Sequence, residues 1–214
     1  MTPEKFIYKV VELYRHARKA TVPNRLVRRG RSHAVSSKTE DLLADFLVKN
    51  DKKIEKIYVD QPITILDRGK KWNIYPDLLI IKKGKITAFM DLKMDLGFAR
   101  NKLYSICLQH NKNLLRMRGN RISLKDGLTK EYIEYRVSSK ATYDVVIISR
   151  RNINKDQLNI HINRVKRIGN STKVFVLVDG HPNEYNKKID VVMKKISIRF
   201  AEFERLLGRL GNGK

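Results

Sequence analysis

The segment 76–93 constrains the fold of this chain more than any other, because it holds two apolar runs around a Lys-Lys-Gly-Lys turn. This pattern predicts an antiparallel β-hairpin. Asp77 lies in the first run, and Asp91 and Lys93 close the second. Side chains alternate between the faces of a strand, so Asp91 and Lys93 point to the same face. Charged residues on an otherwise apolar hairpin need a reason other than core packing.

The turn decides whether Asp77 shares that face. A three-residue loop over 82–84 places Asp77 diagonally opposite Asp91 on the same face, whereas a two-residue turn over 83–84 places it on the opposite face. We adopt the three-residue loop. The hairpin then brings two carboxylates together with the ammonium group of Lys93.

Carboxylates that lie close together repel each other, and a hard divalent cation such as Mg²⁺ relieves this repulsion while keeping several waters. A lysine beside such an ion can position an attacking water and offset charge on a phosphate. The residues therefore indicate phosphodiester hydrolysis, with Asp77 and Asp91 as metal ligands and Lys93 beside the water.

The pattern Pro76-Asp77, followed after thirteen residues by Asp91-Leu92-Lys93, resembles the signature of the PD-(D/E)xK nuclease superfamily. The resemblance covers roughly residues 36–112. It implies a Mg²⁺-dependent DNA endonuclease in which Mn²⁺ can substitute. It favours a type II restriction enzyme that acts as a homodimer on double-stranded DNA, with a structure-specific repair or Holliday-junction nuclease as the alternative.

This superfamily commonly supplies a further acidic residue from a helix before the hairpin, and the helix expected over 36–50 offers Glu40. Glu40 shares a helix stripe with Leu43, which favours a catalytic position. Ser37 and Glu40 also match a capping box, in which the glutamate bonds the Ser37 backbone N–H. Both interpretations stay open. Asp41 points about 100° further round the helix, so Glu40 is preferred.

The chain carries 46 Lys and Arg residues against 22 Asp and Glu residues, a formal net charge of +24. Such charge implies a polyanionic partner, and it attracts RNA as readily as DNA. Charge alone does not separate a nuclease from a non-catalytic DNA-binding protein. The residues expected to contact DNA are Arg25, Arg28, Arg29, Arg31 and Arg100.

The length of 214 residues and the 42% hydrophobic content predict one folded domain over 1–214. We expect an N-terminal helix and basic loop over 1–35, a catalytic core over 36–180 and one long C-terminal helix over 188–210. Thr2 and Pro3 mark the start of the first helix.

The later part of the core alternates strand, helix and strand over 142–149, 155–166 and 172–178, which predicts a parallel strand pair joined by a crossover. Together with the hairpin, this order predicts an α/β fold with a central mixed sheet flanked by helices and with helical additions at both ends. We also expect a strand over 56–66 and a helix over 101–117.

Three further residues or segments have simpler interpretations. His110 lies on the apolar stripe of the helix over 101–117, and we interpret it as a core histidine. The stretch 118–140 has no firm structural signal and is a candidate binding insertion. A single cysteine, Cys107, excludes an intrachain disulfide and fits a reducing cytoplasm.

No apolar stretch approaches the length of a membrane span. We therefore expect a cytoplasmic protein.

Overall fold

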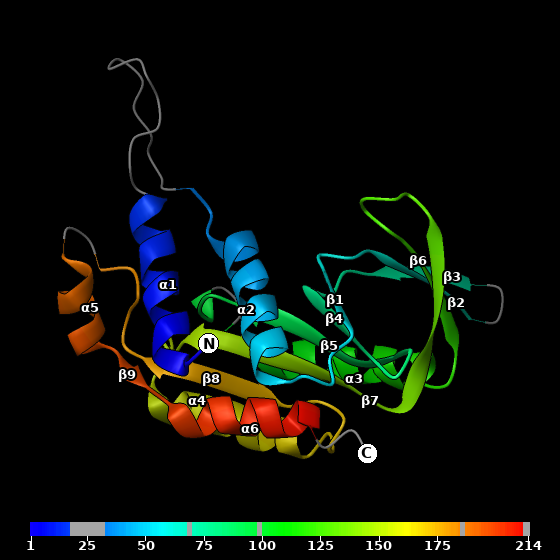
Figure 1. Cartoon of the computed structure of the whole chain (residues 1–214). Helices are drawn as coiled ribbons and strands as arrows, with labels where there is room; N and C mark the ends of the chain where they lie inside the picture. The colour runs from blue at the N-terminus through cyan, green and yellow to red at the C-terminus, as the bar shows by residue number, and fades with distance from the viewer. Residues whose placement is uncertain (18–32, 68–69, 98–99, 185–186, 212–214) are drawn as a thin grey trace, which may run out of the picture.

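The computed structural model describes residues 1–17, 33–67, 70–97, 100–184 and 187–211. In these residues the chain has an α/β fold with a seven-stranded mixed sheet between helices (Figure 1). The helices are α1 (Pro3–His16), α2 (Ser36–Asn50), α3 (Leu103–Met117), α4 (Lys155–Lys166), α5 (Ile189–Lys195) and α6 (Phe200–Gly211). The strands are β1 (Lys56–Val59), β2 (Ile63–Asp67), β3 (Lys70–Ile74), β4 (Leu78–Lys82), β5 (Lys85–Lys93), β6 (Arg121–Lys125), β7 (Tyr132–Ser149), β8 (Val174–Asp179) and β9 (Ser197–Ile198). The expected fold class is confirmed.

The strand order of the main sheet is β1-β4-β5-β7-β8-β9, and β6 pairs with β7 outside this path. β4 and β5 form the expected antiparallel hairpin, β5 runs parallel to β7, and β7 runs parallel to β8. α4 connects β7 to β8, so the predicted crossover is confirmed.

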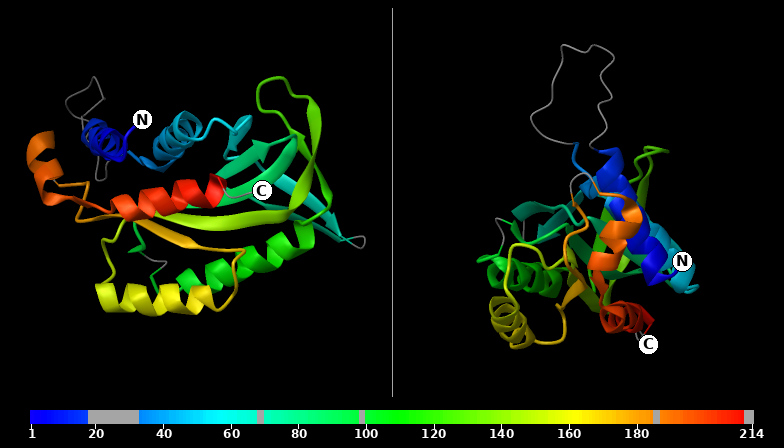
Figure 2. Two further views of the ribbon diagram at one scale, coloured as in Figure 1. Left: turned by 60° about the horizontal axis from the view of Figure 1, so that its bottom comes forward. Right: turned by 90° about the vertical axis from the view of Figure 1, so that its left-hand side faces the viewer.

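Helices cover both faces of the sheet. Figure 2 shows α1, α2 and α6 on one side and α3 and α4 on the other. On the first side, the rings of Phe6, Phe46 and Phe203 pack against one another with centroids 5.4 to 5.9 Å apart. The N-terminal helix begins as predicted, because the Thr2 hydroxyl accepts a hydrogen bond from the Lys5 backbone N–H at 3.2 Å.

The single long helix expected over 188–210 is wrong. The chain leaves the helical conformation at Ile196, where φ is −89° and ψ is 127°, and forms β9 before α6 begins. Ile198 of β9 pairs with Val178 at the edge of β8. This pairing satisfies backbone groups of an edge strand that would otherwise be unpaired, and the two isoleucines favour an extended backbone.

The strand expected over 56–66 is two strands. Asp60 has a φ of 49° and Pro62 lacks a backbone N–H, so the ladder breaks between β1 and β2. β2 then pairs with β3, a strand that the sequence patterns did not predict, in a separate two-stranded sheet. The stretch 118–140 is also more regular than expected, because it contains β6 and the first half of β7 as an antiparallel ribbon.

Candidate active site

The turn of the β4–β5 hairpin differs from the one we expected. Lys82 pairs with Lys85, so the connection is the two residues Lys83 and Gly84, which have φ values of 50° and 64°. Positive φ at both central residues is typical of a type I′ turn. The expected three-residue loop is therefore wrong.

A β-bulge returns Asp77 to the face of Asp91, although the two-residue turn alone would place it on the opposite face. The register shifts between Ile80 and Ile81, so that Ile80 pairs with Ala88 and Thr87 is the extra residue in β5. Beyond the bulge Leu78 pairs with Met90. Asp77, the residue just before β4, therefore lies next to Asp91 despite the two-residue turn.

Lys93 joins the two carboxylates. Its Nζ lies 3.9 Å from Asp77 Oδ2 and 3.7 Å from Asp91 Oδ2. The backbone N–H of Leu92 also donates to Asp77 Oδ2 at 2.5 Å, which fixes this carboxylate against the end of β5. The structure thus brings together all three residues that the hairpin motif indicated.

The environments of the two aspartates push their pKa values in opposite directions. Burial raises the pKa of Asp77, and the negative charge of Asp91 raises it further against the opposing effects of Leu92 and Lys93. Burial also acts to raise the pKa of Asp91, but contacts with His110, Lys93 and Tyr143 hold it below its ordinary value. Asp91 is therefore the firmly ionised member of the pair.

His110 and Tyr143 were not among the predicted site residues. His110 Nε2 lies 2.9 Å from Asp91 Oδ2, and the Tyr143 hydroxyl donates to Asp91 Oδ1 at 3.0 Å. Their rings stack with centroids 4.0 Å apart and an interplanar angle of 9°. The interpretation of His110 as a core histidine missed this contact, because α3 and β5 meet only in the folded chain.

Glu40 lies near the site and does not cap its helix. The N-cap of α2 is Val35, and no side chain caps the helix there, so the capping-box interpretation is wrong. Glu40 is only 9% exposed. Burial, followed by the charges of Asp77 and Asp60, raises the pKa of Glu40 from 4.5 to about 7. The Glu40 carboxylate is therefore close enough to interact electrostatically with Asp77.

The donor set can be compared with the needs of Mg²⁺, which proteins commonly hold through one or two carboxylates and several waters. Asp77 and Asp91 supply two. Burial is the main cause of the raised pKa values of Asp77 and Glu40, and neighbouring carboxylates add a smaller repulsion that a cation would relieve. In the part of the chain that is described, no group of three or more His, Cys, Asp or Glu side chains is arranged to hold a metal ion. Asp77 and Asp91 therefore fit a site in which two carboxylates and several waters hold the ion.

Of the residues expected to contact DNA, Arg100 is exposed in a turn after β5. Arg25, Arg28, Arg29 and Arg31 lie outside the described residues. No helix in the described ranges is long and apolar enough to cross a membrane.

Comparison with known proteins gives no assignment for this site. No protein-family model, curated protein or solved structure matches the chain.

Proposed function

We propose that the chain is a Mg²⁺-dependent DNA endonuclease of the PD-(D/E)xK type. The observation that carries this proposal is the convergence of Asp77, Asp91 and Lys93 at one end of the β4–β5 hairpin, with Lys93 Nζ within 4 Å of both carboxylates. Two acids that share one ammonium group are suited to bind a cation and a phosphodiester together.

The side chains have distinct roles in this proposal. Asp77 and Asp91 hold the ion, which when bound polarises the scissile phosphate and activates water. Lys93 orients the attacking water and offsets charge on the phosphate. Glu40, with a pKa of about 7, can accept a proton near neutral pH.

His110 and Tyr143 act as positioning residues. They contact different oxygens of Asp91, and each carboxylate oxygen has a second lone-pair direction that remains for a cation.

The β6–β7 ribbon supports DNA as the substrate. Its register places Arg121 directly opposite Arg136, and both side chains are exposed. Like charges in such a pair destabilise a sheet, and Glu134, 3.6 Å from Arg121, offsets only one of them. A phosphate backbone would neutralise the other. A two-stranded β-ribbon can also enter the major groove of DNA.

The tip of the ribbon is an ordered turn. Asp126 Oδ1 accepts hydrogen bonds from the backbone N–H groups of Leu128 at 2.8 Å and Thr129 at 3.0 Å. This turn presents Leu128 at 94% exposure. An apolar side chain at the end of a basic ribbon is suited to contact bases in a groove.

Within this class, we propose a sequence-specific type II restriction enzyme that acts as a homodimer, because cutting both strands of a palindrome uses two related sites. A repair or junction nuclease would use the same chemistry on branched DNA. Parallel digests of linear duplex and four-way junctions separate the two.

The test is cleavage of plasmid and phage DNA by purified protein with Mg²⁺, with Mn²⁺ and with EDTA. We expect metal-dependent cleavage that is lost in the Asp91→Ala and Lys93→Ala variants. The matched control is Lys53→Ala, because Lys53 is the exposed lysine of the only other acidic-x-Lys triplet in the sequence. DNA that is retarded but intact in every lane would instead support a non-catalytic binding protein.

A further inference from the structure

Asp91 is held by side chains from two different elements. His110 belongs to α3, and its Nε2 lies 2.9 Å from Asp91 Oδ2. Tyr143 belongs to β7, and its hydroxyl donates to Asp91 Oδ1 at 3.0 Å. The two rings stack with centroids 4.0 Å apart. The position of Asp91 therefore depends on how α3 is placed against β7.

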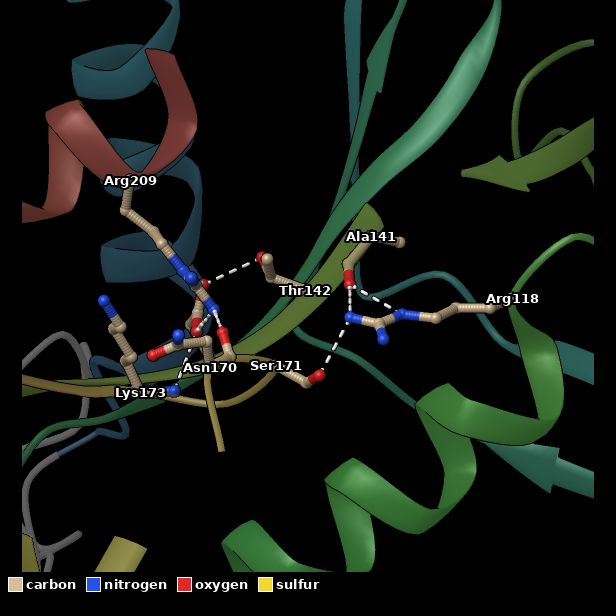
Figure 3. A network of polar contacts seen from close by, with 8 residues as sticks. Arg118, Ala141, Thr142, Asn170, Ser171, Lys173 and Arg209 are labelled. Atoms are coloured by element: carbon tan, nitrogen blue, oxygen red, sulfur yellow. Dashed lines mark hydrogen bonds and ion pairs between the residues drawn. The ribbon is translucent and has the colours of Figure 1, made fainter. Parts of the chain in front are cut away.

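Arg118 connects these two elements directly. It is the C-cap residue of α3, about two helical turns beyond His110. Its Nε and Nη2 both donate to the Ala141 carbonyl of β7, at 3.1 and 2.6 Å (Figure 3). Ala141 lies two residues before Tyr143, and both side chains are buried in the same part of the core. Arg118 thus ties the end of α3 to β7 beside the tyrosine that contacts Asp91.

The same guanidinium also contacts the segment that pairs with Tyr143. Nη2 of Arg118 donates to the Ser171 hydroxyl at 2.9 Å (Figure 3). The backbone N–H of Tyr143 donates to the carbonyl of the same serine at 3.0 Å. Arg118 therefore binds both β7 itself and the segment that is hydrogen bonded to the Tyr143 backbone.

The opposite face of β7 is anchored separately. Asp144 follows Tyr143 along the strand and has no exposed surface, and its oxygens accept from Arg209 Nε at 3.2 Å and Nη2 at 3.3 Å. The Thr142 hydroxyl and the Lys173 backbone N–H also donate to Asp144, at 2.9 and 2.8 Å (Figure 3 shows these partners). Arg209 belongs to α6, on the side of the sheet opposite to α3. The strand is therefore fixed from α6, and Arg118 holds α3 against it.

The contacts of Arg118 include no ion pair within the described ranges. Its acceptors there are a backbone carbonyl and a hydroxyl. Burial, followed by the positive charge of Arg209, lowers the pKa of Arg118 below its ordinary value. A partly buried charge without a counter-ion is unfavourable for folding, so a gain in stability alone does not explain an arginine here. A planar guanidinium with several donors can, however, bind two elements at once.

We propose that Arg118 is a positioning residue of the candidate active site. By tying the end of α3 to β7, it keeps the rings of His110 and Tyr143 stacked. The stacked pair then holds Asp91 in place for the ion. This inference rests on the proposed function, in which Asp91 is a metal ligand, but the ring stack itself can be measured without metal or DNA.

Proton NMR of the metal-free protein measures the ring stack. Tyr143 lies on His110 with an interplanar angle of 9°, so its ring current shifts the His110 Cε1–H signal to lower frequency. The chain has five histidines, and His110→Gln identifies this signal among them. At constant pH, Arg118→Ala should move the signal towards its position in Tyr143→Leu. Arg118→Lys keeps a donor for the Ala141 carbonyl and should retain most of the shift.

Arg116→Ala is the matched control. Arg116 is an exposed arginine of α3, and its guanidinium lies over the Trp72 ring, 5.5 Å from the centroid. Its removal should leave the His110 signal unchanged. Ser171→Ala removes one hydrogen bond of Arg118 and is the milder second variant. It should move the His110 signal in the same direction as Arg118→Ala, but by less.

Isothermal titration with Mg²⁺ and cleavage kinetics connect the ring stack to the site. Arg118→Ala should weaken Mg²⁺ binding by about tenfold, the lower end of the effects of outer-shell residues on metal sites. Its kcat for DNA should fall while KM stays within about twofold, as expected when Asp91 is displaced and the DNA contacts are kept. Val192→Ala controls for lost stability, because Val192 is buried in α5, which packs on α1. Unfolding curves show that each variant is folded at the assay temperature.

Three results would overturn this role of Arg118. The first is an unchanged His110 signal in Arg118→Ala. The second is a changed signal with the Mg²⁺ affinity of the wild type, and the third is an equal effect of Arg116→Ala. A wild-type chain that neither binds Mg²⁺ nor cuts DNA would overturn the proposed function instead, and the His110 signal would still show whether Arg118 holds the two rings together.

Discussion

Replacing Glu40 by glutamine should stabilise the protein at alkaline pH. The folded state raises the pKa of Glu40 from 4.5 to about 7, so folding favours the neutral carboxyl. The stability that Glu40 contributes is fully present below its unfolded pKa and is lost as the pH rises through the folded pKa. Glutamine is always neutral and keeps nearly the same shape, so it does not incur this loss.

The size of the effect follows from the shift. One pKa unit corresponds to about 1.4 kcal/mol, so a rise from 4.5 to about 7 gives an upper limit of about 3.5 kcal/mol. Screening by solvent at the helix end reduces this value, and we expect about 1 to 3 kcal/mol. For a chain of this length, that difference raises Tm by about 2 to 12 °C.

The assay is urea and thermal unfolding of wild type and Glu40→Gln at several pH values. The two proteins should have similar stability near about pH 4.5, diverge up to about pH 7 and keep a constant difference above it. Asp41→Asn is the matched control, because Asp41 is the exposed neighbouring acid on the same helix. Equal stability at every pH, or a less stable Glu40→Gln at alkaline pH, would contradict a raised pKa of Glu40 in the folded state. Mg²⁺ should reduce the difference if it binds beside Glu40.

Three other changes have defined outcomes. Asp144→Ala leaves the guanidinium of Arg209 without its carboxylate and should lower the free energy of unfolding in urea by about 3 to 5 kcal/mol. The double variant Asp144→Ala/Arg209→Leu should recover part of this loss. A loss under about 1 kcal/mol would contradict a buried ion pair. Lys83→Asn suits the first position of a type I′ turn and should raise the free energy of unfolding by about 0.5 kcal/mol, whereas an unchanged or lower value would count against this turn. Arg136→Ala removes one positive charge from the β6–β7 ribbon, so filter binding should show a weaker affinity for DNA. The slope of log affinity against log salt concentration should fall by about one. An unchanged affinity would mean that DNA does not bind at this ribbon.

The sequence predicted the face of Asp77 correctly for the wrong reason. The Lys-Lys-Gly-Lys pattern allowed two turns, and the observed two-residue turn by itself reverses that face. The bulge at Thr87 returns Asp77 to the face of Asp91. No local sequence signal predicts how β4 pairs with β5 around this bulge. Register was therefore the part of the site that local patterns could not supply.

Contacts between distant segments account for the other differences. Periodicity located α4 at its exact bounds, because that helix depends on its own amphipathic pattern and on the Asn154 cap. The same periodicity failed over 188–210, where pairing with β8 outweighs helix propensity at Ile198. His110 contacts Asp91 although the two residues are well separated in the sequence, and no sequence motif includes both.

Binding and cleavage measured on the same samples test whether the β4–β5 hairpin forms a catalytic site. Wild type, Lys93→Ala and the control Lys53→Ala would be mixed with DNA and Mg²⁺, and each sample would be split between a gel-shift and a cleavage assay. We expect all three proteins to bind DNA and only Lys93→Ala to fail to cut it. Cleavage by Lys93→Ala at the wild-type rate, or intact DNA with all three proteins, would contradict a catalytic site at the β4–β5 hairpin.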